Sequence, residues 1–111
     1  MVIKTSYFAK SGKLENAVSI AVGTPKFFAG PSFKPLMPPW PLVNGYKNGS
    51  ISEAEYEEEY KKTVLEKLDA AIIGRELDGK TLLCWEKSGV FCHRHIVASW
   101  LRERGYEVEE A

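Results

Sequence analysis

The last third of the chain constrains the fold most, because its hydrophobic pattern changes twice in a short distance. Residues 80–85, KTLLCW, form an apolar run that is typical of a buried strand. Residues 92–104 then carry apolar side chains at helical spacing and end before Gly105, a typical C-cap. Residues 106–109, YEVE, alternate as a short last strand does. Strand, helix and strand at this spacing predict a βαβ unit.

The upstream patterns extend this prediction to the whole chain. Residues 2–8 and 17–22 read as strands, and the second is apolar enough to be covered on both faces. Ser52 and Glu55 form a capping box at the start of a helix, and Asp69 is placed to cap a second helix over 70–77. The predicted fold is α/β: a small two-layer or three-layer sandwich with a mostly parallel central sheet, Rossmann-like or flavodoxin-like. A length of 111 residues predicts one domain, 1–111.

Charge and hydrophobic pattern argue against two classes of partner, duplex nucleic acid and membranes. The formal net charge is zero, with a pI near 6.7, so nothing drives the whole surface toward nucleic acid, and we do not expect duplex nucleic acid as a partner. No apolar run approaches the roughly 18 residues of a membrane span, and the first residues lack the apolar core of a signal peptide. We therefore expect a cytoplasmic protein, no membrane partner and reduced cysteines. The oligomeric state is not predicted.

Residues 24–50 have a different character, because they hold all six prolines of the chain together with many aromatic side chains. Proline disrupts regular ladders and helices, whereas disordered segments are poor in aromatics. Two interpretations stay open. The segment is an irregular flap packed over the core, or it provides an aromatic wall for a ligand.

The reactive side chains gather at one place, between the predicted strand 80–85 and the predicted helix 92–104. Cys84 and Glu86 lie at the carboxyl end of the strand, whereas Cys92, His93 and Arg94 lie in the first turn of the helix. Ligands of open α/β sheets bind outside the carboxyl ends of strands. A helix N-terminus attracts anions, and an arginine fork suits phosphate or carboxylate. The pattern predicts a site for a small anionic or nucleotide-like ligand.

Each side chain has an expected role at such a site. Glu86 is a candidate general base or ribose-hydroxyl acceptor, His93 an alternative acid or base, and Cys92 a reactive thiol. The candidate catalytic residues are therefore Glu86, His93 and Cys92, and the candidate ligand-binding residues are Arg94, Ser6, Tyr7, Lys10 and Cys84.

A structural interpretation of the same residues stays open. Glu86 and Arg94 would form an ion pair across the loop, both cysteines would pack in the core, and His93 would be a hydrogen-bonded core residue. His95 falls on the outer face of the helix, where we expect it to be exposed.

The same stretch resembles two other kinds of site. Cys84, Cys92 and His93 or His95 are suitable zinc ligands, but no Cys-x2-Cys knuckle is present, so no metal and no cofactor are predicted. The stretch CWEKSGV also resembles the phosphate loop of rhodaneses and cysteine phosphatases. In that loop an arginine follows the cysteine after five residues, and Val90 stands at that position here.

The stretch LLCWEKSGVFCHRHIVASWL is similar to the C-x-E…C-H-R signature of the DUF488 family, and TSYFAK and EYKKTVLEKLD also look like small phage and bacterial members. The resemblance implies a small α/β fold with the motif lining a pocket, and no established activity. Cys84, Glu86, Cys92, His93 and Arg94 match the motif, and Ser6 and Tyr7 match the polar end of the first strand. Larger members carry Asp-Val-Arg before a proline, where this chain has Ile20-Ala21-Val22.

Two hypotheses for the function follow. The domain binds or processes a nucleotide or another small phosphorylated ligand at the site around Cys84–Arg94. Alternatively, it is a non-catalytic binding, sequestering or protein-interaction module in which the motif is structural. The sequence does not decide whether the protein is an enzyme.

Overall fold

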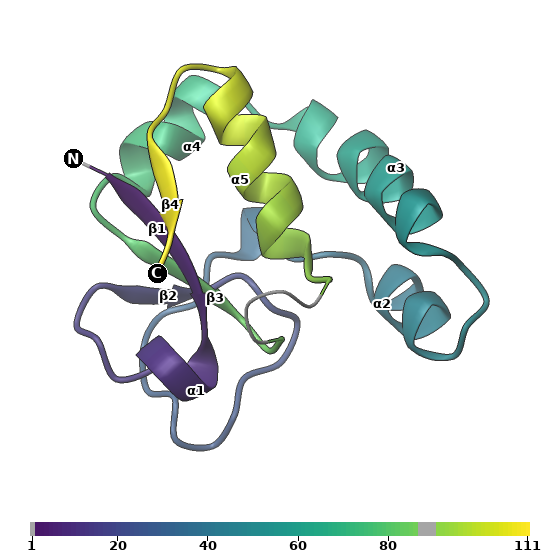
Figure 1. Cartoon of the computed structure of the whole chain (residues 1–111), viewed down its shortest axis with the longest axis horizontal. Helices are drawn as coiled ribbons and strands as arrows, with labels where there is room; N and C mark the ends of the chain where they lie inside the picture. Colours follow the sequence, from purple (N-terminus) through teal and green to yellow (C-terminus); the bar gives the residue numbers. More distant parts are fainter. Residues whose placement is uncertain (1, 87–90) are drawn as a thin grey trace.

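The computed structural model describes residues 2–86 and 91–111 and has the predicted α/β fold, with a parallel sheet of four strands (Figure 1). The order of strands across the sheet is β2-β3-β1-β4. This arrangement is that of a small Rossmann-like protein, so the predicted fold class is confirmed. The strands are β1 (Ile3–Tyr7), β2 (Ala17–Ser19), β3 (Thr81–Cys84) and β4 (Val108–Glu110).

Helices make up most of the remaining regular structure. The two predicted helix starts are confirmed: Ser52 and Glu55 form the reciprocal capping box, and the Asp69 carboxylate accepts from the amide of Ala71 at 2.9 Å. The described helices are α1 (Phe8–Ser11), α2 (Trp40–Lys47), α3 (Glu53–Thr63), α4 (Ala70–Glu76) and α5 (His93–Glu103), with short 3₁₀ turns η1 (Lys34–Leu36) and η2 (Leu65–Lys67).

The carboxyl-terminal βαβ unit is present as β3-α5-β4, but its two strands are not neighbours. Strand β1 lies between them and pairs with both. The register places Tyr7 of β1 beside Cys84 of β3, and Thr5 of β1 beside Glu110 of β4. Helix α5 therefore crosses over β1, and its first turn lies near the carboxyl ends of the central strands (Figure 1).

Buried residues on both faces of the sheet explain why its strands are so apolar. On one face, Val18, Leu82 and Val108 belong to the core that includes α3, α4 and α5. On the other face, Leu83 and Ala17 pack with Phe8 of α1 and with Phe28. Strands covered on both faces carry near-continuous apolar runs, as the sequence pattern of residues 17–22 indicated.

The proline-rich segment 24–50 is more regular than predicted, since it contains η1 and α2. Leu36 and Leu42 are buried in the core, and the Tyr60 hydroxyl donates to the Leu36 carbonyl. Pro39 is the N-cap of α2 and Pro41 lies in its first turn, where proline costs no helical hydrogen bond. The segment does pack over the core as expected, and it leaves Trp40 half exposed at 57%.

Several boundaries differ from the predicted ones. Strand β1 stops at Tyr7, one residue before the predicted end, and a short helix, α1, for which no helix was predicted, begins at Phe8. Strand β2 stops at Ser19, although the Ile20 amide still donates to the Leu83 carbonyl at 3.0 Å. Neighbouring apolar side chains are buried whether or not the ladder continues, so the apolar pattern alone overestimates strand length.

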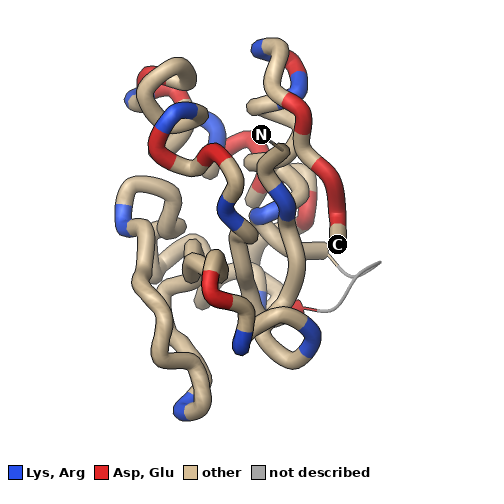
Figure 2. Tube along the Cα trace, turned by 90° about the vertical axis from the view of Figure 1, so that its left-hand side faces the viewer, with Lys and Arg blue, Asp and Glu red and all other residues tan. Residues whose placement is uncertain are grey.

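Charged positions of both signs are interspersed along the trace in the view of Figure 2. Among the described residues, no helix is long and apolar enough to cross a membrane.

Candidate functional site

A cavity of about 320 Å³ lies at the carboxyl ends of β2 and β3, against the start of α5. Residues 21–23 follow β2 and form one side, and residues 84–86 at the end of β3 form another. Cys92 and His93, at the start of α5, also line it. Four of the predicted site residues therefore share this cavity: Cys84, Glu86, Cys92 and His93.

The walls of the cavity are largely aromatic. Trp40 and Tyr46 of α2 line it together with Phe91, and the Tyr46 and Phe91 rings lie 4.9 Å apart. The Trp85 indole donates to the Gly23 carbonyl at 2.8 Å, which ties the ends of β2 and β3 together. Tyr56 of α3 lines the cavity too, and burial raises the pKa of its phenol, so this hydroxyl stays neutral. The aromatic-wall interpretation of segment 24–50 is thus consistent with the position of Trp40.

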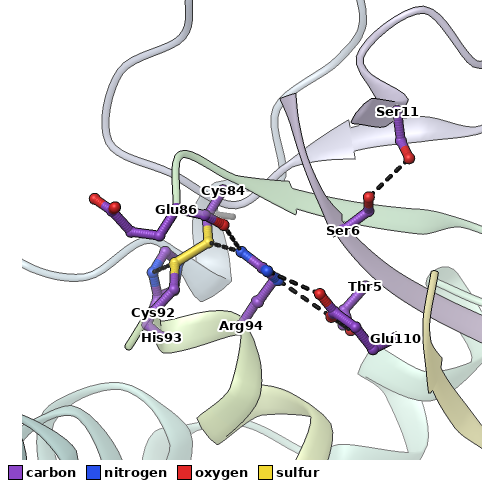
Figure 3. Close-up of polar contacts among 9 residues, drawn as sticks. All are labelled: Thr5, Ser6, Ser11, Cys84, Glu86, Cys92, His93, Arg94 and Glu110. Carbon is purple, nitrogen blue, oxygen red and sulfur yellow. Dashed lines mark hydrogen bonds and ion pairs between the residues drawn. A yellow bond between two sulfur atoms is a disulfide. The ribbon is translucent and has the colours of Figure 1, made fainter. Parts of the chain in front are cut away.

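Arg94 occupies a different place from the one expected of an anion-binding residue. Its side chain is fully buried and forms a bidentate pair with Glu110: Nε donates to Oε1 at 3.2 Å and Nη2 to Oε2 at 2.8 Å (Figure 3). Nη1 donates to the Cys84 sulfur at 3.0 Å and to the backbone carbonyl of Glu86. The guanidinium also lies over the Tyr7 ring, 5.8 Å from its centroid.

Arg94 therefore lies against the ends of β1 and β3, in contact with Tyr7 and Cys84, and does not line the cavity. The ion pair expected between Glu86 and Arg94 is not the one formed, because the Glu86 carboxylate points away from the guanidinium and Glu110 is the acidic partner (Figure 3). Glu110 also accepts a hydrogen bond from the Thr5 hydroxyl at 2.6 Å. This network joins β1, β3, β4 and α5, so it holds the start of α5 against the sheet.

His93 is a buried residue with a defined tautomer, and its ring lies 5.5 Å from the ring of Tyr60, a core residue. Its Nε2 lies 2.7 Å from the Ile20 carbonyl oxygen. A carbonyl oxygen only accepts, so Nε2 carries the proton and Nδ1 keeps its lone pair. Burial lowers the pKa of the imidazole to about 4, so at neutral pH the ring is uncharged, and its one N–H proton, on Nε2, is donated to the Ile20 carbonyl.

The two cysteines correct another expectation. They were expected to be reduced, whereas Cys84 and Cys92 are joined by a disulfide. The end of β3 and the N-cap of α5 meet at the carboxyl edge of the sheet, and that meeting brings the sulfurs together. Composition predicts only whether the protein's compartment is reducing or oxidising. It does not predict that these two cysteines lie close together in the fold. In this oxidised form Cys92 has no free thiol, although its sulfur lies 3.8 Å from Nδ1 of His93.

The remaining predicted residues lie outside the cavity. Ser6 is buried and shares a 2.7 Å hydrogen bond with Ser11, away from the cluster of cysteines (Figure 3). Tyr7 lies under Arg94, and Lys10 is exposed in the last turn of α1. His95, expected to be exposed, is half-buried. Val90, where a phosphate loop would carry its arginine, lies outside the described residues.

Sequence reasoning missed several residues of the site. These residues line the cavity but come from several parts of the chain, and no local sequence pattern connects them. They are Tyr46, Lys47, Tyr56, Trp85 and Phe91. The side of the strand on which Glu110 lies could have been predicted from the sequence. Glu110 stands two residues after the buried Val108 in an alternating strand, so it shares the core-facing side of β4.

Comparison with protein-family models, with curated proteins and with solved structures finds no match for this chain. The fold and the cavity place the protein in a class: small parallel α/β proteins with a pocket at the carboxyl ends of their strands. The resemblance to the DUF488 family stays a prediction.

Proposed function

We propose that this protein binds a flat, anionic small molecule of the nucleotide class in the cavity at the ends of β2 and β3. The observation that carries the proposal is the cavity itself, with aromatic walls beside a helix N-terminus. Its volume of about 320 Å³ falls at the small end of the range of ligand pockets, roughly 300–1,000 Å³. A nucleobase or a comparable ring is the right size for it.

The aromatic residues favour a planar ligand. Trp40 and Trp85 are about half exposed, at 57% and 52%, and both line the cavity. Stacking of a base on such a side chain contributes about 1–3 kcal/mol. An aliphatic ligand would contact the same walls without stacking on them. The proposal therefore predicts that ligands with an aromatic ring bind more tightly than sugar phosphates do.

The anionic part of the ligand needs partners other than Arg94, whose donors serve the buried network. Lys47 of α2 lines the cavity and is exposed. Helix α5 begins there too, and Cys92, its N-cap residue, makes no side-chain cap hydrogen bond within the described chain. First-turn amides of such a helix suit an anion. Lys47 and the start of α5 thus replace Arg94 in the proposed anion subsite.

Glu86 is the candidate for chemistry in this cavity. Among the described residues, Glu86 provides the carboxylate that lines the cavity. This carboxylate would accept a hydrogen bond from a ribose hydroxyl or act as a general base. Whether the ligand is released unchanged separates the two possibilities. If the parent binds the ligand without converting it, and Glu86→Gln still binds the ligand, the protein is a sequestering module.

The test is a thermal-shift screen with nucleotides, cyclic nucleotides, nucleosides, sugar phosphates and inorganic phosphate. A ligand at about 100 times its dissociation constant stabilises the fold by roughly 2.7 kcal/mol, which raises the melting temperature by about 10 °C for a domain of this size. The proposal expects the largest shift with a nucleotide. Trp40→Ala and Lys47→Ala should each reduce it.

Matched variants separate loss of binding from loss of structure. Lys62→Ala removes an exposed lysine of α3 that does not line the cavity, so it should leave the shift unchanged. A Cβ placed on Gly23 meets no atom within 4 Å, and Gly23 lines the cavity, so Gly23→Leu should fill space there while the fold persists. A shift that is equal in the parent and in folded Gly23→Leu would contradict the proposal.

A further inference from the structure

The side chains of Cys84, Cys92 and His93 bring three atoms of metal-ligand type close together. The two sulfurs and a ring nitrogen of His93 all lie within 4.8 Å of one another, and all three residues are buried. In a tetrahedral site with Zn–S near 2.3 Å and Zn–N near 2.0 Å, adjacent ligand atoms stand about 3.5–3.8 Å apart. The 3.8 Å between the Cys92 sulfur and Nδ1 of His93 matches this spacing.

The surroundings of His93 orient it as a ligand. Because Nε2 donates to the Ile20 carbonyl, Nδ1 keeps its lone pair on the side of the Cys92 sulfur. Metal-bound histidines almost always donate their other ring N–H to a carbonyl, a carboxylate or water. The hydrogen bond to Ile20 is therefore the outer partner that a metal site requires.

The charges of the cluster favour a divalent cation. The buried guanidinium of Arg94 is already balanced by the Glu110 carboxylate. If both cysteines were thiolates, the region would carry two uncompensated negative charges, which burial disfavours strongly. A divalent cation neutralises them, and the N–H···S hydrogen bond from Arg94 to Cys84 at 3.0 Å stabilises one thiolate further.

The spacing of the two cysteine backbones also accommodates an ion. Their Cα atoms lie 7.1 Å apart, just beyond the range of roughly 4.4–6.8 Å that most disulfides span. A cation held between the sulfurs allows the backbones to stay at this separation.

We propose that the reduced protein binds one zinc-class divalent cation through the sulfurs of Cys84 and Cys92 and through Nδ1 of His93. The three ligands all line the cavity, so the fourth coordination position would open toward it, as in zinc sites with three protein ligands. The disulfide is the alternative, oxidised state of the same cluster. This inference concerns metal binding and does not depend on the nucleotide proposal.

The two states are connected by a balanced exchange. A phosphine and one water molecule break the S–S bond and give two thiols and the phosphine oxide. Cation binding then forms two metal–sulfur bonds and one metal–nitrogen bond, and both thiol protons pass to solvent. Oxidation of the thiolates by a disulfide compound restores the protein disulfide, releases the cation and yields two thiolates of that compound, which take two protons from solvent.

The test uses the full chain, reduced with a phosphine in the absence of metal, and Co²⁺ and Zn²⁺ as probes. Thiol titration should count two thiols after reduction. Co²⁺ should then bind one to one and produce a thiolate-to-cobalt charge-transfer band with the visible bands of a tetrahedral site, and Zn²⁺ should displace it. The non-reduced protein should show no such band.

Variants test which side chains bind the metal. Cys84→Ser and Cys92→Ser should weaken Co²⁺ binding by more than the roughly 10- to 100-fold typical of losing an outer partner. His95→Gln, on the same helix turn but outside the cluster, should leave it unchanged, and Trp40→Ala should lower ligand binding while metal binding persists. A reduced parent with two titrated thiols that binds no Co²⁺, or binds it without the charge-transfer band, would overturn the proposal.

Discussion

The Arg94–Glu110 pair allows a quantitative prediction for Glu110→Gln. This substitution keeps the size of the side chain and removes the charge that balances a guanidinium with no exposed surface. Breaking a buried pair from one side costs about 3–5 kcal/mol. The Glu110 side chain is 26% exposed, so water solvates part of the site, and we expect a loss near the lower end, about 3 kcal/mol.

The matched control is Glu109→Gln, because Glu109 is the preceding residue of β4 and points to the exposed side. Denaturant unfolding should show a free energy of unfolding about 3 kcal/mol lower for Glu110→Gln and nearly unchanged for Glu109→Gln. The same loss should lower the melting temperature by about 12 °C for a chain of this length. Equal stability of the two variants would refute the claim that this network holds α5 against the sheet.

Three further predictions concern stability. The pKa of His93 falls from an ordinary 6.5 to about 4, so the unfolded state binds the extra proton between these values. Stability should therefore drop by roughly 3 kcal/mol as pH falls from 6.5 to 4, and His93→Gln should flatten this dependence in pH-dependent unfolding. Gly74→Ala should lower the melting temperature, although alanine has the better helix propensity, because the added Cβ would stand 2.4 Å from the Tyr106 ring. Adding Tyr106→Ala to the same chain should relieve this loss. Ser52→Ala removes the capping box of α3 and should cost about 1 kcal/mol in denaturant unfolding.

The fold was predictable where local patterns and long-range packing agree. The run at residues 80–85, the amphipathic stripe of α5 and the turn at Gly105, whose φ is +90°, each indicated their element, and together they predicted the βαβ unit. The position of β1 between β3 and β4 was not predictable in this way, because strand order depends on which edges pair and no local periodicity records it.

The candidate site was predictable in part, for a similar reason. A strand end and a helix start next to each other in sequence placed Cys84, Glu86, Cys92 and His93 together, and the structure brings these four to one cavity. The role expected for Arg94 depended on its being open to solvent. Burial is a tertiary property, and the partner that takes up the arginine, Glu110, comes from another strand.

The central claim is that the cavity at the ends of β2 and β3 binds a nucleotide-class ligand, and tryptophan fluorescence tests it most directly. Trp40 and Trp85 line the cavity, whereas Trp100 of α5 does not and packs against Arg104. Titration with nucleotides should quench the emission of the parent saturably, with the quenching preserved in Trp100→Phe and reduced in Trp40→Phe. Absence of saturable quenching with every nucleotide, or quenching lost only in Trp100→Phe, would contradict the account.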